Sequence, residues 1–137
     1  MKNFITERFA INGLFTLLSL VVIFHLLIML RIIPFKIVWG GRLEDLSEML
    51  VFETVSVIIN LIMLAVVGIK AGFLRTKINR MVIKIALWIM FVLFLINTIG
   101  NFFSNNEFEK IVFTPLTIIL LIFSLRLAIS KDKKIAG

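Results

Sequence analysis

Four long apolar stretches, separated by short charged segments, constrain this chain more than any other feature. They cover residues 9–30, 49–69, 85–106 and 111–130. The first and third contain no Lys, Arg, Asp or Glu, and the other two contain one each, Glu53 and Arg126. A run of about 20 apolar residues matches the roughly 30 Å hydrocarbon core of a bilayer. The sequence therefore predicts an all-α fold, a four-helix transmembrane bundle with short loops.

The expected helices lie within a single integral membrane domain of residues 1–137. We place them at about 9–33, 47–70, 81–102 and 111–130. Pro34 should end the first helix, and Gly72 is placed to cap the second. Thr114-Pro115 fits the start of the fourth helix, but an earlier start with a kink at Pro115 is equally open. Arg126 is close enough to the end of its stretch to extend into the head groups.

Composition excludes several classes of protein. Hydrophobic residues make up 61% of the chain and the mean hydropathy is +1.11, far outside the range of soluble domains. The absence of cysteine excludes disulfides, thiolate metal sites and cysteine nucleophiles. Metal-ligand spacings, phosphate-binding loops and nucleophile motifs are also missing. We therefore expect no cofactor and no metal, and the sequence favours a role other than catalysis.

The net charge of +7 is distributed as a topology signal. The segment 70–84 holds five Lys and Arg residues and no acid, and both tails are basic. The other two connections carry most of the acids. Because Lys and Arg stay on the cytoplasmic side during insertion, we expect both termini inside. The compact form of the chain and its Ile-, Lys- and Asn-leaning composition suggest a bacterial cytoplasmic membrane. The basic segments would attract anionic lipid, and we expect no nucleic-acid partner.

Two small motifs outside the polar core are candidates for interaction. The outer loop contains Trp39 and Arg42, which fit either an interfacial turn or a lid that presents Arg42 to an anion. In the second helix, Gly68 and Gly72 form a small-xxx-small pair. Such a pair suits close packing within the chain or contact with a second copy, so a homo-oligomer or a larger membrane partner is open.

Glu53 is the strongest functional pointer in the sequence. Without it, only the sixteen residues 54–69 remain before Lys70, and they span about 24 Å, less than the hydrocarbon thickness. A carboxylate inside the membrane costs free energy and tends to face the bundle interior, a partner or water. We therefore expect Glu53 inside the outer edge of the membrane, either fixing helix packing or serving a site.

Helical rise places further polar residues at the depth of Glu53, on all four helices. This predicted intramembrane polar cluster comprises His25, Glu53, Ser56, Asn60, Asn97, Asn101 and Thr117. His25 and Glu53 are the right types for a proton-handling pair. Alternatively, the cluster holds the polar head of a lipid or small molecule, or only hydrogen-bonds the helices together.

Four segments resemble those of small uncharacterised bacterial four-helix integral membrane proteins. They are Val38-Trp-Gly-Gly-Arg-Leu43, Phe52-Glu53, Asn97-Thr-Ile-Gly-Asn101 and Phe113-Thr-Pro-Leu-Thr117. The resemblance implies a multi-pass membrane fold and supplies no activity, cofactor or catalytic residue.

Three functional classes follow from the sequence. The first is a small binding or transport protein with an outward-facing polar pocket, which takes a lipid or small-molecule ligand. The second is an accessory or assembly subunit of a larger membrane complex. The third is a lipid-modifying or isomerising enzyme, with Glu53 and His25 as acid and base.

Overall fold

The computed structural model describes residues 5–33, 45–74, 76–104 and 107–130. These residues form four helices: α1 (Glu7–Met29), α2 (Leu46–Ala71), α3 (Arg80–Phe102) and α4 (Glu107–Ala128). All four are long and apolar enough to cross a membrane. Only 22% to 39% of each helix's most apolar window is buried inside the protein, so most of the apolar surface faces outwards. This pattern fits a multi-pass membrane protein.

Polar caps define where the first three helices begin. The side chains of Thr6, Asp45 and Asn79 accept hydrogen bonds from backbone N–H groups two or three residues further on, at 3.1, 2.8 and 2.8 Å. Each bond satisfies a donor that has no partner within the helix. Thr114 does not cap α4, because α4 begins at Glu107 and contains Pro115. The sequence alternative with an earlier start is therefore the one observed.

Helices α1 and α2 end with the same backbone conformation, a left-handed residue just after the last helical turn. In α2, Gly72 has φ 84°, and the N–H of Phe73 bonds the Gly68 carbonyl at 2.9 Å. In α1, Arg31 takes the equivalent position with φ 64°, so the helix ends at Met29, before the expected Ile33. Both are Schellman motifs, in which a left-handed residue lets the chain satisfy the last carbonyls.

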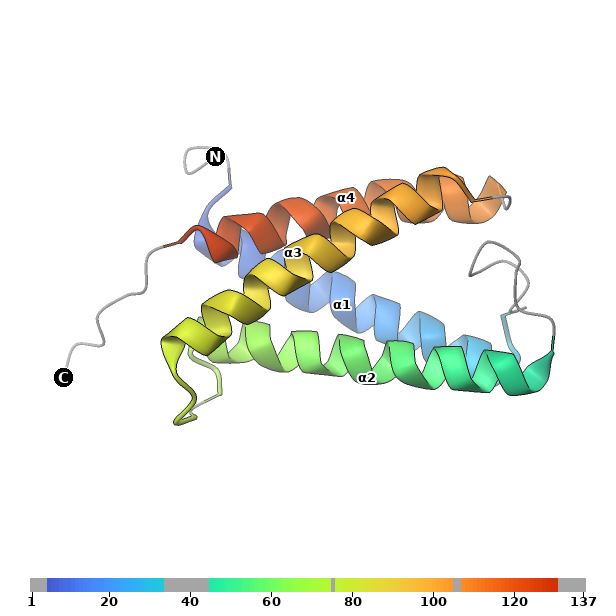
Figure 1. The fold of residues 1–137 in the computed structure, drawn as a ribbon, viewed down its shortest axis with the longest axis horizontal. Helices are drawn as coiled ribbons and strands as arrows, with labels where there is room; N and C mark the ends of the chain where they lie inside the picture. The colour runs from blue at the N-terminus through green and yellow to red at the C-terminus, as the bar shows by residue number, and fades with distance from the viewer. Residues whose placement is uncertain (1–4, 34–44, 75, 105–106, 131–137) are drawn as a thin grey trace.

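The helices pack as two antiparallel pairs, α1 with α2 and α3 with α4 (Figure 1). The two pairs are joined mainly by contacts between α1 and α4, and the contact between α2 and α3 is smaller. We call the end where α1 and α3 begin the basic end, because Arg8, Lys70, Lys77 and Arg80 lie there, and the other the far end. The pairs separate towards the far end (Figure 1).

The main apolar core occupies the middle and the basic half of the bundle, and a small cluster around Ile28 and Met49 lies near the far end. Gly13 of α1 lies against the ring of Phe123 of α4 so closely that a Cβ at Gly13 would overlap it. Gly68 packs near Phe15 of α1, but a Cβ at Gly72 would meet no described atom within 4 Å. Within this chain Gly72 therefore shapes the turn, and Gly13 allows the close helix approach.

Arg126 lies at the basic end and packs against the protein. Its side chain is only 7% exposed, and its Nε donates a hydrogen bond to the Ile5 carbonyl at 2.8 Å. This bond ties the segment before α1 to the end of α4. A buried guanidinium needs such partners because its desolvation is costly.

Candidate functional site: a cleft among the four helices

All four helices contribute to one cleft of about 270 Å³, which we call the four-helix cleft. Its polar lining residues are His25, Ser56, Asn60, Asn97, Asn101 and Thr117. The remaining nine are apolar: Val21, Phe24, Ile59, Met63, Leu93, Phe94, Phe113, Leu116 and Leu120. The cleft thus lies between the two helix pairs, with a mixed polar and aromatic wall.

Glu53 lies beside this cleft and makes contact with His25. The Nδ1 atom of His25 and the Oε2 atom of Glu53 form a hydrogen bond between α1 and α2. The Glu53 side chain is fully buried, whereas the His25 side chain is 16% exposed and lines the cleft. With Glu53 ionised, Nδ1–H is the donor, which directs the other ring nitrogen away from the carboxylate.

Two asparagines of α3, Asn97 and Asn101, line the cleft with their side-chain amides. Among the residues that the structure describes, neither Asn97 nor Asn101 has a hydrogen-bond partner for its side chain. Asn60 differs, because its Nδ2 donates to the Ser56 carbonyl at 2.7 Å within α2. Its amide oxygen is left as an acceptor. The α3 carboxamides therefore have both donors and acceptors for a bound molecule.

A threonine pair joins α3 to α4 at the edge of the cleft. Oγ1 of Thr98 lies 2.9 Å from Oγ1 of Thr117. When Thr98 donates to Thr117, Thr117 can donate to the Phe113 carbonyl at 2.9 Å, so both hydroxyls are satisfied. Sequence reasoning missed Thr98, although its position one turn after the buried Phe94 places it on an inward face of α3.

The other candidate residues lie apart from the cleft. Trp39 and Arg42 fall outside the described residues. Gly68 and Gly72 lie at the basic end of α2. Among the described residues, no three His, Cys, Asp or Glu side chains are grouped so that they could hold a metal ion. Six of the seven residues that were predicted from depth therefore line one cleft, and the seventh, Glu53, bonds to one of them. That these residues bind a ligand stays a prediction.

The apolar core closes the path from the cleft to the basic end. Leu14, Leu18, Leu87 and Leu127 of this core are at most 1% exposed. The cleft is therefore a pocket rather than a pore in this conformation. Comparison with known protein families, curated proteins and solved structures finds no match for this chain, so functional inference rests on the cleft and its chemistry.

Proposed function

We propose that this chain is a small membrane-embedded binding protein, with an outward-facing cleft that takes an amphipathic small molecule. One observation carries the proposal: six polar side chains from four helices line a single cleft whose other walls are apolar. Ligand sites have this composition, mostly apolar with a few convergent polar groups. At about 270 Å³, the cleft is slightly smaller than most ligand pockets, so it suits a small ligand.

The chemistry of the walls suggests how such a ligand would lie. Asn97 and Asn101 supply donors and acceptors for its polar group, and His25 supplies a ring nitrogen backed by Glu53. Phe24 and Phe113, whose rings are 5.0 Å apart, would contact its apolar part. An intramembrane ionisable pair beside a cleft is a common feature of binding and proton-relay sites.

Transport would be an extension of the same function. Because the apolar core separates the cleft from the basic end, passage needs the α3–α4 pair to move against the α1–α2 pair. Of the four main interfaces between the described helices, the one between α2 and α3 is the smallest. The α2–α3 interface therefore offers the least resistance to such a movement.

Native mass spectrometry of the protein released gently from its host membrane tests this proposal. The variant Asn97→Leu removes the hydrogen-bonding group at nearly constant volume, and Asn97 is exposed, so the fold should be kept. Thr54→Val is the matched control, because Thr54 is polar, exposed and outside the cleft. We expect a small molecule that co-purifies with wild type and Thr54→Val and is lost from Asn97→Leu.

Two results would contradict the proposal. One is a ligand that all three proteins retain equally. The other is a second polypeptide that is bound in fixed ratio to all three proteins without any small molecule. The latter would instead support the accessory-subunit alternative.

A further inference from the structure

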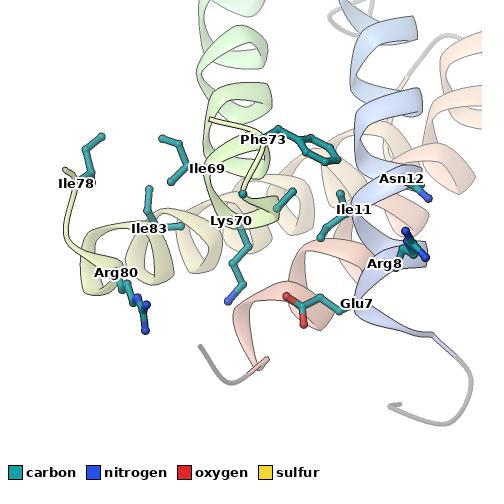
Figure 2. A pocket seen from close by; sticks show the side chains of 12 residues that line it. Glu7, Arg8, Ile11, Asn12, Ile69, Lys70, Phe73, Ile78, Arg80 and Ile83 are labelled. Atoms are coloured by element: carbon teal, nitrogen blue, oxygen red, sulfur yellow. The ribbon is translucent and has the colours of Figure 1, made fainter. Parts of the chain in front are cut away.

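A second cleft, of about 610 Å³, lies at the basic end between the start of α1, the end of α2 and the start of α3. We call it the basic cleft. Four charged side chains line it, Glu7, Arg8, Lys70 and Arg80 (Figure 2). Three of these four are cations, and they come from three different helices. The cleft therefore favours an anion.

Helix ends add to this preference. Arg8 is the second residue of α1 and Arg80 is the first residue of α3. The N-terminal turn of a helix presents free N–H groups and a partial positive charge, which favour a nearby anion. Arginine also binds phosphate oxygens through two parallel hydrogen bonds. Both arginines are exposed, so they are free of the desolvation that burial imposes.

The polar and apolar parts of the basic cleft are separated. In Figure 2 the charged ends of Glu7, Lys70 and Arg80 lie along one side, whereas Ile69 and Phe73 lie towards the side where α2 continues into the bundle. The apolar lining also includes Ile11, Ala71, Ile78 and Ile83. An inorganic anion would leave this apolar wall unused, but a lipid would cover it with its acyl chains.

Depth in the membrane agrees with a lipid as the occupant. The 23 residues of α1 and of α3 each span about 34 Å, slightly more than the roughly 30 Å hydrocarbon core. The charged ends of the helices therefore lie at the level of the head groups. We propose that the basic cleft binds an anionic phospholipid, with its phosphate held by the cations that line the cleft, Arg8, Lys70 and Arg80, and its chains along Ile69 and Ile83. This site is separate from the four-helix cleft and independent of its proposed function.

Lipid titration of the full-length protein, followed by native mass spectrometry, tests the site. The probes are phosphatidylglycerol and, as the neutral comparison, phosphatidylcholine. The cleft variant is Arg8→Gln with Arg80→Gln, and the matched control is Lys77→Gln with Lys84→Gln. The control removes the same charge from exposed residues at the same end, outside the cleft. We expect phosphatidylglycerol affinity to fall about tenfold or more in the cleft variant and by about twofold at most in the control.

Glu7→Gln provides a test with the opposite sign. Among the described residues that line the basic cleft, Glu7 is the only acid, so phosphatidylglycerol should bind this variant a few-fold more tightly. Helical circular dichroism of each variant checks that the protein stays folded.

Four results would overturn the proposal. Equal losses in the two double variants would indicate diffuse surface attraction, and equal affinity for the two lipids would exclude recognition of the anionic head group. Displacement of the lipid by millimolar inorganic phosphate would assign the cleft to a free anion. Weaker binding by Glu7→Gln would show that the acid helps to hold the ligand.

Discussion

His25 of α1 and Glu53 of α2 form a hydrogen bond although 28 positions separate them in the chain. The pair connects a fully buried carboxyl to a ring that reaches the four-helix cleft. An acid at this depth is stabilised by its partner, and the cleft gains a polar group of fixed orientation.

The pair predicts a non-additive response to mutation. His25→Leu removes the imidazole from a buried carboxyl and should lower the free energy of unfolding by about 1–3 kcal/mol. Replacing both residues by leucine should cost less than His25→Leu alone, because no desolvated carboxyl is left behind. Unfolding in mixed detergent micelles measures both values, with Thr54→Val as the control. A double variant that is less stable than His25→Leu would contradict this account.

The close approach of α1 and α4 predicts a steric effect at one glycine. The Cβ of Gly13→Ala would overlap the ring of Phe123, which also packs edge-on against Phe9 at 5.4 Å. We expect a loss of about 1–3 kcal/mol in unfolding free energy. Gly100→Ala is the control, because its Cβ would meet no described atom within 4 Å. Equal effects at the two glycines would show that helix propensity, and not packing, determines the result.

The hydroxyl contact between Thr98 and Thr117 should couple α3 to α4 weakly. A double-mutant cycle with Thr98→Val and Thr117→Val is expected to give about 0.6 kcal/mol, because interhelical hydrogen bonds in membrane proteins average about this value. Stability measurements on the four proteins of the cycle provide this number. A coupling energy near zero would mean that each hydroxyl is satisfied by its own backbone carbonyl.

The left-handed residues at the ends of α1 and α2 predict changes of opposite sign. Arg31→Gly should stabilise the protein by about 1 kcal/mol, because an L-residue at φ 64° is strained and glycine is not. Gly72→Ala should destabilise it by a similar amount. Thermal unfolding followed by circular dichroism compares them. Arg31→Gln is the control, because it removes the charge and keeps the strain, so stabilisation by this variant would contradict the argument.

Helix number and depth could be predicted from the sequence because they depend on composition and on a constant rise per residue. The depth of Glu53 led to Asn60, Asn97 and Asn101, which line one cleft. The rotation of each helix about its axis was harder to infer. In lipid the outside of a bundle is as apolar as its inside, so hydrophobic periodicity hardly distinguishes the two faces.

Because helix rotation is hard to infer from an apolar sequence, some residues could not be recognised. Thr98 and Gly13 are defined by which face meets a neighbour, and neither stands out in an apolar sequence. Depth alone also does not reveal that the Nε of Arg126 bonds the Ile5 carbonyl at the basic end. The end of α1 was assigned to Pro34, whereas the chain turns earlier at Arg31 through a conformation that arginine seldom adopts.

The pairing of α1 with α2 has a consequence for biogenesis. Both members of the His25–Glu53 pair belong to the first two spans, so the carboxyl meets its partner as soon as that hairpin has entered the bilayer. Helices insert first and associate afterwards, and the ribosome delivers the N-terminal half before the rest. The hairpin can therefore pair its buried carboxyl before the later spans arrive, whereas the four-helix cleft needs all four spans.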